Sequence, residues 1–385
     1  MKIIRGFSRI VFALVFILSG IFKLIDPAGT GLIVQEYLNF MHLSFLGGIR
    51  IWIGVLLASL EFTVGISVMV GLKMRITATA GFVMTIFFTA VTIVLVAFDP
   101  IDDCGCFGEA IHLTNTQSLI KNIVLLVMAT VIFIGRKECV KIAPEWLQWC
   151  FLSAFLAFAL YSAIYIIISN PKVEFTAYRV GTDLNDLYSE GQAQFETVFI
   201  YEKDGQTKDF TLSNLPDSTW TYVDSRTEMT GGSTEMALID FHPHTLSGNY
   251  FAASVYDSER IPQRIEERIR DFRFRCGANG VEMRVYRPGS SESGYEADWK
   301  SLMTLNRSNG GITYFSDGVI VKKWSASQID DIDIAGVVSE DPDVLVLKGR
   351  IDEQIYISTV VLGILLLLLL LRYFCGMFSK TSSKK

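Results

Sequence analysis

Two cysteines one residue apart, Cys104 and Cys106, are the residues of this chain best suited to chemistry. They lie in the sequence DCGCFGE, a short acidic stretch between two long apolar segments. Thiolates attack disulfides, and a disulfide across one intervening residue closes a small, strained ring that is easily reduced. Gly105 gives the backbone the freedom to form such a ring. The pair therefore predicts thiol–disulfide exchange; a static disulfide and two free thiols are the alternatives.

The charges around the pair oppose strong nucleophilicity. Asp102, Asp103 and Glu109 are negative at neutral pH and disfavour a neighbouring thiolate. Lys121 or His112 would offset them if the loop folds over either side chain. We therefore do not expect a highly reactive nucleophile.

The other four cysteines are spread along the chain as Cys139, Cys150, Cys276 and Cys375. One close pair with scattered single cysteines is typical of a redox or structural dithiol and differs from the framework of a small disulfide-rich domain. Cys276 follows a predicted helix, and we expect it to be a buried small apolar residue.

Metal, cofactor and nucleic-acid sites are not indicated. His242 and His244 flank a proline without an evident third ligand, so surface-loop histidines explain them better than zinc. No phosphate-binding loop, serine nucleophile elbow or HExxH helix is present. A quinone would be a chemically suitable electron acceptor, but no residue pattern supports one. The chain has 34 Lys and Arg against 40 Asp and Glu and no long basic run, which argues against nucleic-acid binding.

Half of the 385 residues are hydrophobic, and they gather in segments long enough to cross a bilayer. A transmembrane helix needs about 20 apolar residues. Six segments qualify: 7–25, 51–71, 76–98, 119–135, 146–168 and 355–371. The first lacks a small-residue cleavage site, so we expect a retained span and not a signal peptide. Membrane lipid is therefore a predicted partner.

Basic residues fall into the loops on one side of these spans. They precede the first span, lie between the second and third and between the fourth and fifth, and follow the sixth, whereas the alternate loops are acidic. By the positive-inside rule, this pattern places both termini in the cytoplasm and residues 172–354 in the periplasm of a diderm bacterium. The loop with Cys104 and Cys106 would also lie outside the cytoplasm.

Five polar residues lie within or at the ends of the predicted spans: Arg9, Lys23, Glu61, Lys121 and Asn122. Charges inside a bilayer are costly unless they are partnered, which makes these residues candidate functional groups. Glu61 is central in its span, so we expect it to pair with Arg9 or Lys23, or to relay protons. Lys23 and Lys121 lie near span ends and could instead extend to the interface.

The segment between the fifth and sixth spans has the pattern of a mixed α/β domain. Two short apolar runs around an Asp-Gly turn, 197–201 and 208–212, predict a β-hairpin. Later patterns predict strands over 249–256, 281–286, 312–315 and 319–324 and helices over 261–274 and 298–305. The β-α-β-α-β-β order matches a thioredoxin-type layout, preceded by a β-rich segment. An acidic connector over 330–343 is expected to lead back to the membrane.

The membrane part resembles the DoxX/MauE-like family. The resemblance is carried by Arg9, the Ser-Gly and Lys-Leu-Ile-Asp-Pro residues of 19–27, Glu61, the CGCFG loop of 104–108, and Lys121 with Asn122. These positions cover about the first 135 residues. The resemblance implies a four-helix membrane unit, and MauE is linked with disulfide maturation of a periplasmic enzyme. In the bacterial envelope subgroup that this chain resembles, a fifth span, a periplasmic thioredoxin-like region and a last span follow.

The thioredoxin-like region departs from a redox enzyme at two places. Residues 257–260 read DSER where a redox thioredoxin would have CxxC. The position expected to hold a cis-proline before the last strand pair is Gly310. This region is therefore predicted to have the thioredoxin shape without dithiol activity.

The predicted architecture is an α-helical integral membrane bundle of about six transmembrane helices joined to an extramembrane α/β thioredoxin-like domain. Its predicted parts are a DoxX/MauE-like four-helix domain over 1–140, a fifth span over 141–171, a β-rich periplasmic segment over 172–240, the thioredoxin-like domain over 241–345, a last span over 350–373 and a cytoplasmic tail over 374–385.

Two functions fit this architecture in the bacterial inner membrane. In the first, Cys104 and Cys106 are catalytic residues that exchange electrons with a periplasmic or envelope protein. In the second, the protein is a non-enzymatic scaffold or assembly subunit that binds envelope proteins through its extramembrane domain. Transport of a small molecule or proton through the bundle, with Glu61 and Lys23, ranks third.

Overall fold

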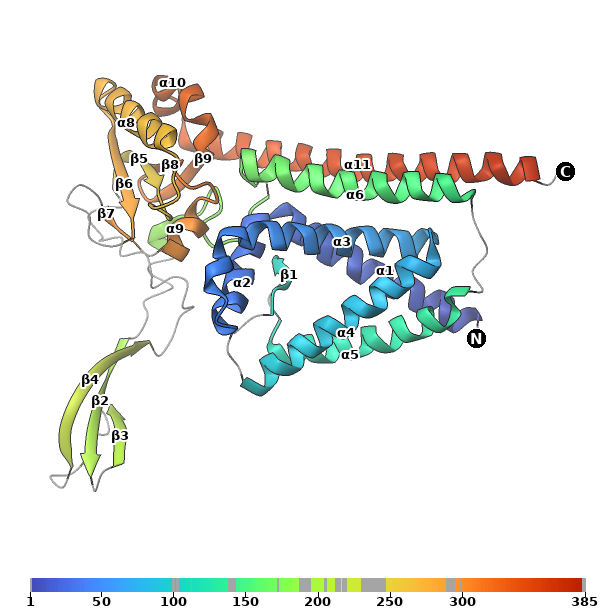
Figure 1. Ribbon diagram of the computed structural model, residues 1–385. Coiled ribbons are helices and arrows are strands. Elements are labelled where there is room, and N and C mark those ends of the chain that lie inside the picture. Colours follow the sequence, from blue (N-terminus) through green and yellow to red (C-terminus); the bar gives the residue numbers. More distant parts are fainter. Residues whose placement is uncertain are drawn as a thin grey trace. The chain divides into compact units, whose positions relative to one another are not determined.

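The computed structural model describes residues 2–98, 101, 104–111, 113–137, 143–171, 173–186, 195–203, 206–211, 216, 220–229, 247–288, 295–297 and 299–382. The chain divides into two compact units, Met1–Thr176 with Leu347–Lys385, and Ala177–Val346. The first unit holds long apolar helices, and the second holds the β-sheets (Figure 1).

Six helices of the described chain are long and apolar enough to cross a membrane, in agreement with the six predicted spans. They are α1 (Lys2–Ile25), α3 (Arg50–Val70), α4 (Met74–Phe98), α5 (Asn115–Ile134), α6 (Glu145–Ser169) and α11 (Pro342–Ser382). Short 3₁₀ helices, η1 (Ser44–Ile49) and η2 (Gly135–Lys137), precede α3 and follow α5. A short extended segment, β1 (Cys106–Glu109), lies in the connection between α4 and α5 and reaches α1 and α2 (Figure 1).

The helix α2 (Pro27–Phe40), between the first two spans, was not predicted. The Asp26 carboxylate accepts a hydrogen bond from the Gly29 N–H at 2.9 Å, and Pro27 occupies the first turn. An aspartate N-cap followed by proline is a strong helix start, because it satisfies a free backbone donor and presets the backbone angle. Asp26 and Pro27 therefore begin a helix.

Helices α1 and α3 pack closely because glycines replace side chains where their backbones meet. A Cβ atom on Gly20 would lie 2.7 Å from the Phe62 backbone nitrogen, and one on Gly65 would lie 2.8 Å from the Ile17 nitrogen. Small residues permit this approach between membrane helices, where packing drives association more than the hydrophobic effect does. The close contact places α1 residues opposite Glu61 of α3.

Two apolar clusters fill the first unit on either side of this helix pair. One joins α1 and α3 to α6 through residues such as Phe62, Phe151 and Phe155. The other joins them to α4 and α5 through residues such as Phe12 and Leu125. The polar residues of the bundle therefore lie in a framework of close-packed helices.

The second unit contains a five-stranded mixed sheet in the order β7-β6-β5-β8-β9. Strand β5 pairs parallel with β6 and antiparallel with β8, and β8 pairs antiparallel with β9. The strands are β5 (Asn249–Ser254), β6 (Glu282–Arg287), β7 (Tyr295–Glu296), β8 (Gly311–Ser316) and β9 (Val319–Trp324). Helix α8 (Gln263–Ala278) connects the parallel strands, and α9 (Trp299–Leu305) precedes β8. The predicted strands and helices are thus present, whereas the two-residue β7 was not predicted.

The predicted acidic connector over 330–343 contains helices that were not predicted. This region contains the end of η5 (Ala326–Asp331), all of α10 (Ile334–Ser339) and the start of α11. Asp333 accepts a hydrogen bond from the Gly336 N–H at 3.1 Å and begins α10, while Ile332 and Ile334 are buried in the domain core. Acidic residues serve here as helix caps between buried isoleucines, which a reading by charge alone does not reveal.

Three further strands form a separate antiparallel sheet in the order β3-β2-β4. They are β2 (Phe195–Lys203), β3 (Gln206–Thr211) and β4 (Thr221–Met229). Strands β2 and β3 are the predicted hairpin, with Lys203 paired to Gln206 at its end. The third strand, β4, was not predicted.

Cys276 lies in the core of the second unit, as predicted. Its side chain is fully buried against α8 and sheet residues such as Phe251 and Val281. Burial raises the pKa of the Cys276 thiol to about 12, because the thiolate would lose its hydration, and the nearby Arg275 only partly offsets this. The thiol is therefore inert at neutral pH.

Candidate redox site

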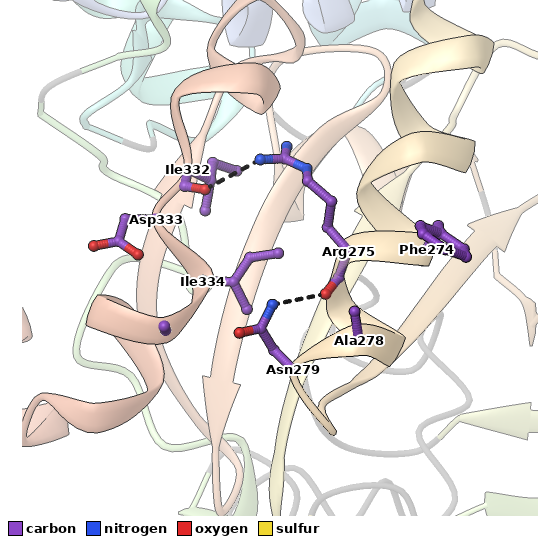
Figure 2. Close-up of a pocket in the computed structure, with 8 residues that line it drawn as sticks. Phe274, Arg275, Ala278, Asn279, Ile332, Asp333 and Ile334 are labelled. Atoms are coloured by element: carbon purple, nitrogen blue, oxygen red, sulfur yellow. Dashed lines mark hydrogen bonds between the residues drawn. The ribbon is translucent and has the colours of Figure 1, made fainter.

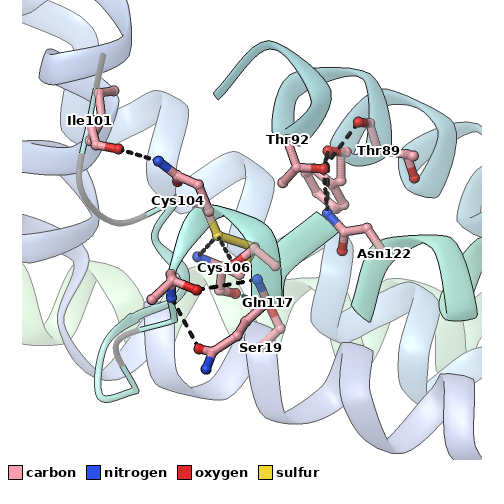
Figure 3. The surroundings of a disulfide bond; sticks show 12 residues. Ser19, Thr89, Thr92, Ile101, Cys104, Cys106, Gln117 and Asn122 are labelled. Carbon is pink, nitrogen blue, oxygen red and sulfur yellow. Dashed lines mark hydrogen bonds between the residues drawn. A yellow bond between two sulfur atoms is a disulfide. The ribbon is translucent and has the colours of Figure 1, made fainter. Parts of the chain in front are cut away.

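Cys104 and Cys106 form a disulfide at the start of β1 (Figure 3). The backbone between and after them turns sharply: Gly105 and Gly108 have φ angles of 64° and 60°, and the Gly108 N–H donates to the Gly105 carbonyl at 3.1 Å. Positive φ angles of this kind are accessible to glycine at little cost. The glycines of the CGCFG sequence therefore shape the turn that brings the two sulfur atoms together.

Hydroxyl groups from two helices hold the two cysteine carbonyls. The Tyr37 hydroxyl of α2 donates to the Cys104 carbonyl at 2.9 Å, and Ser19 Oγ of α1 lies 2.6 Å from the Cys106 carbonyl oxygen. The Asn115 amide at the start of α5 donates to the Ile101 carbonyl at 2.7 Å. The disulfide loop is therefore seated on the bundle by three side chains.

The start of α5 is determined by a capping box. Thr114 accepts a hydrogen bond from the Gln117 N–H, and the Gln117 side chain accepts one from the Thr114 N–H. This reciprocal arrangement satisfies two donors of the first turn. It also positions Ser118, one residue further on, against the disulfide.

The two sulfur atoms have different surroundings. The Cys104 side chain is only 7% exposed and packs against Leu95 and Ile101, whereas Cys106 is partly exposed. Ser118 Oγ lies 3.0 Å from Cys104 Sγ, and the Cys106 N–H donates to the same sulfur at 3.3 Å. Hydrogen bonds and a helix N-terminus both favour a thiolate. Cys104 is thus the better-stabilised leaving group, and Cys106 is the more accessible sulfur.

Lys23 and Glu61 form a buried ion pair in the bundle. Lys23 Nζ lies 2.7 and 2.9 Å from the two carboxylate oxygens, and the side chains are 6% and 1% exposed. The expected pairing of Glu61 is confirmed, with Lys23 and not Arg9 as the partner. The alternative in which Lys23 extends to the interface is wrong, because the Glu61 carboxylate holds its ammonium group inside the bundle.

Arg9 has another role in the bundle. Its Nε donates to the Val68 carbonyl at 2.7 Å, and a terminal nitrogen donates to the Met69 carbonyl at 3.1 Å. These carbonyls lie in the last turn of α3, whose backbone acceptors have no partner within the helix. Arg9 therefore caps the end of α3, and a cation there also opposes the helix dipole favourably.

Asn122 and Lys121 lie one turn beyond Ser118. The Asn122 amide is 3.3 Å from both the Phe88 carbonyl and Thr92 Oγ1 of α4, so it joins α5 to α4 (Figure 3). Lys121 Nζ lies 4.7 Å from the centre of the ring of Phe107, the residue that follows Cys106. Lys121 is therefore close to the disulfide loop, whereas Asn122 connects the two helices on either side of this loop.

Residues 1–135 match the family described as Methylamine utilisation protein MauE. The match ends where α5 and η2 meet, so it covers the four spans α1, α3, α4 and α5 together with the disulfide loop. Residues 195–230 match a domain of unknown function, DUF8463, and contain the β3-β2-β4 sheet. No curated protein and no solved structure matches the chain.

Within the MauE-matching region, several site residues were not recognised from the sequence as contacts of the disulfide: Ser19, Tyr37, Ser118 and Asn115. Ser19 was part of the family signature, and the Thr-Asn-Thr-Gln sequence of residues 114–117 carries a detectable capping pattern. Tyr37 had no local signal, because its helix was itself not predicted.

Several residues considered in the sequence analysis cannot be placed in the site. His112, His242, His244, Asp102 and Asp103 lie outside the described residues, as does the Glu109 side chain. Among the described residues, no three His, Cys, Asp or Glu side chains group together as metal ligands.

In the second unit, the junction after β5 is held without thiols. The Asp257 N–H donates to Asn309 Oδ1 at 3.2 Å, and Asn309 Nδ2 donates to the Asp257 carbonyl at 2.8 Å. Gly310 has a φ angle of 85°, and its N–H donates to the Ser254 carbonyl at 2.7 Å. A proline at position 310 could neither donate this hydrogen bond, because it has no N–H, nor adopt this φ angle, because its ring fixes φ at a negative value.

A pocket of the second unit lies between α8 and α10 (Figure 2). It is lined by Phe274, Arg275, Ala278, Asn279, Ile332, Asp333, Ile334 and Ala335. The Asn279 amide donates to the Arg275 carbonyl at 2.8 Å, which closes the end of α8. No cysteine or histidine lines this pocket, so it adds nothing to the redox site.

Proposed function

We propose that this membrane protein performs thiol–disulfide exchange through Cys104 and Cys106. The observation that carries the proposal is the difference between the two sulfurs: Cys104 is buried beside two hydrogen-bond donors, and Cys106 is partly exposed. The match of residues 1–135 to the family described as Methylamine utilisation protein MauE supports it. The resemblance to that family implies a link with disulfide maturation of a periplasmic enzyme.

The exchange reaction follows from these surroundings. A partner thiolate attacks Cys106 Sγ, the Cys104–Cys106 bond breaks, and its electron pair leaves on Cys104. A second partner thiolate then attacks the mixed disulfide and displaces Cys106. The partner has lost two electrons and gained a disulfide, while its two protons end on Cys104 and Cys106. The same steps run in reverse when the partner is the disulfide.

Ser118 and the Cys106 N–H act on the leaving sulfur. Both donors point at Cys104 Sγ, at 3.0 and 3.3 Å, and they stabilise the charge that forms when the disulfide breaks. A leaving thiolate of lower pKa departs faster. We assign Cys106 as the sulfur that bonds the partner and Cys104 as the leaving sulfur, which resolves the mixed disulfide when the reaction runs in reverse.

The membrane arrangement that suits this function places the disulfide loop outside the cytoplasm. Basic residues in the first turns of α1, around the connection between α3 and α4, and between α5 and α6 support a cytoplasmic location for those ends. Both termini are then cytoplasmic, residues 172–354 are periplasmic, and the membrane is the bacterial inner membrane.

We propose further that the five-stranded sheet is a thioredoxin-like domain that recruits the partner. The order β6-β5-β8-β9, with one parallel and two antiparallel pairings, supports this assignment. Its Asp257 junction has no thiol and its Cys276 is buried, so the domain would bind a partner and leave the chemistry to the membrane loop.

Trapping of a mixed disulfide tests the sulfur assignment. In the full-length protein, Cys104→Ser leaves Cys106 able to capture a partner but removes the resolving thiol. We expect a partner adduct that disappears on reduction and is at least tenfold more abundant than with Cys106→Ser. Cys150→Ser, which removes an exposed thiol of α6, serves as the control.

Equal adducts from the two variants would overturn the assignment of roles. The absence of an adduct from both, with normal protein levels, would overturn the exchange function itself.

A scaffold function is the second candidate. The thiol-free junction at Asp257 and the buried Cys276 favour it, because they describe a domain suited to binding alone. A Cys104→Ser/Cys106→Ser double variant that keeps all envelope partners and the wild-type growth phenotype would favour the scaffold over exchange. Proton or small-molecule transport through the bundle ranks below both.

A further inference from the structure

Cys104 is enclosed by side chains of three helices, α2, α4 and α5. Leu95 of α4 and Ile101 pack against it, and Ser118 Oγ of α5 lies 3.0 Å from its sulfur. Tyr37 of α2 packs against the same apolar cluster, and its hydroxyl donates to the Cys104 carbonyl at 2.9 Å. These neighbours leave the Cys104 side chain only 7% exposed.

Helix α2 also covers the turn between the two cysteines. It lies beside β1, the segment that begins at Cys106 (Figure 1). A Cβ atom on Gly105 would lie 2.5 Å from Ile33 Cγ2, so the Ile33 side chain is packed directly on Gly105. Ile33 and Tyr37 are four residues apart and therefore share one face of the helix. This face of α2 contacts both Cys104 and the turn that follows it.

Among these three helices, α2 differs from the two that span the membrane. It has 14 residues and is not one of the helices long enough to cross a bilayer. Its residues 27–32 are buried, whereas Ile33 and Tyr37 lie further along and are partly exposed. Leu95 and Ser118, by contrast, belong to the spanning helices α4 and α5. Tyr37 can therefore be altered without changing a membrane span.

A thiolate can attack either sulfur of a disulfide. Attack at Cys106 forms a bond from the incoming sulfur to Cys106 Sγ and releases Cys104 with the electron pair, whereas attack at Cys104 releases Cys106. In both cases the incoming thiol is oxidised, one cysteine is reduced, and the proton of the incoming thiol ends on the released cysteine. The sulfur that reacts is decided by access and by the leaving thiolate.

We propose that Tyr37, together with Ile33, is a positioning residue that directs incoming thiols to Cys106. The inference rests on the proposed exchange function and names the side chains that give the attack its direction. The Tyr37 ring closes the approach to Cys104, and its hydroxyl holds the Cys104 carbonyl so that the sulfur stays against Ser118. Cys106 lies outside this cover and is partly exposed. Tyr37 and Ile33 take no part in the bond exchange itself.

Reaction with glutathione measures the direction of attack without a partner protein. The full-length protein in detergent is treated with glutathione, the released thiol is alkylated with iodoacetamide, and mass spectrometry of the loop peptide shows which cysteine carries each group. In the wild-type protein, we expect the glutathione adduct on Cys106 to exceed that on Cys104 by at least about tenfold, because the two sulfurs differ in access. In denaturant, where the cover is lost, the two adducts should be about equal.

Three variants of α2 separate the ring of Tyr37 from its hydroxyl. Tyr37→Ala removes the ring, so the adduct ratio should fall by about tenfold although thermal unfolding shows a folded protein. Tyr37→Phe keeps the ring and should lower the ratio by only about threefold, the factor of one modest hydrogen bond. Ile33→Ala, which uncovers Gly105, should give an intermediate fall and serves as the test if Tyr37→Ala does not fold. Phe40→Ala removes an exposed aromatic ring from the same helix and should keep the wild-type ratio.

Three results would overturn the role of Tyr37: equal adducts in the folded wild-type protein, a wild-type ratio in folded Tyr37→Ala, or an equally large fall in Phe40→Ala. If Tyr37→Ala does not fold, a wild-type ratio in Ile33→Ala overturns the role instead. An unchanged ratio with a trapped partner adduct rejects the role of α2 alone. A changed ratio without any partner adduct rejects exchange with a partner.

Discussion

Ser19, Tyr37 and Ser118 are uncharged residues, yet they determine the surroundings of the disulfide. Ser19 and Tyr37 hold the carbonyls of Cys106 and Cys104, and Ser118 lies against the Cys104 sulfur. The charged side chains of the bundle have other partners: Glu61 and Lys23 form an ion pair, and Arg9 donates to carbonyls at the end of α3. The chemistry proposed for the loop therefore depends on hydroxyl groups that a search for charged or metal-binding residues passes over.

The buried ion pair makes a prediction at the scale of single residues. Glu61→Ala leaves the Lys23 ammonium buried without its partner, so we expect the free energy of unfolding to fall by about 3–5 kcal/mol. Replacing both residues by apolar ones of similar size, as in Lys23→Met/Glu61→Leu, should cost far less, because no uncompensated charge remains. Denaturation of the purified proteins in detergent measures the difference.

Equal losses in the single and double variants would show that the pair is not electrostatically coupled.

At the scale of elements, the bundle brings the disulfide loop to α1, α2 and α5. Glycines allow α1 and α3 to approach, an aspartate cap starts α2, and a capping box starts α5 beside Cys104. Each of these three features is local in the sequence, but together they place α1, α2 and α5 around the disulfide loop. The loop is held by helices and not by neighbours in sequence.

The α1–α3 contact makes a prediction at this scale. A leucine at position 20 would meet the Phe62 backbone, so we expect Gly20→Leu to destabilise the protein by about 1–3 kcal/mol and to separate Ser19 from Glu61. Gly6→Leu is the matched control on the same helix, because a Cβ atom there meets nothing within 4 Å. Thermal unfolding in detergent compares the two, and an effect as large in Gly6→Leu would contradict the packing argument.

At the scale of the whole molecule, a helical unit and a β-containing unit have separate cores. The helical unit holds the disulfide and the ion pair, and the second unit holds the five-stranded sheet with its buried Cys276. This division suits a protein in which one part does chemistry at the membrane and the other binds a partner.

The proposed topology can be tested in whole cells. In a cysteine-free background, Ser258→Cys alters an exposed residue of the second unit, and Ser379→Cys alters the C-terminal tail. We expect a membrane-impermeant maleimide to label position 258 in intact spheroplasts and position 379 only after permeabilisation, because the positive-inside rule places the tail in the cytoplasm. The reverse pattern would invert the proposed orientation and place the disulfide loop in the cytoplasm.

The sequence by itself predicted the six long apolar helices, most strands of the second unit and Cys104 with Cys106 as the candidate site. These are local properties: apolar length, alternation and a short cysteine motif can be read within about 20 residues. The sequence also narrowed the partner of Glu61 to two cations without choosing between them. It did not reveal α2, whose start depends on an aspartate cap, or the helices hidden among acidic residues at 330–343.

Only the tertiary structure revealed which side chains hold Cys104 and Cys106 in place. Ser19 reaches Cys106 across 87 residues of sequence, and Tyr37 reaches Cys104 across 67. It also chose Lys23 over Arg9 as the partner of Glu61 and made Cys104 the buried sulfur. Such contacts depend on how closely helices pack and at which turn their side chains meet, and no periodicity within one segment contains that information.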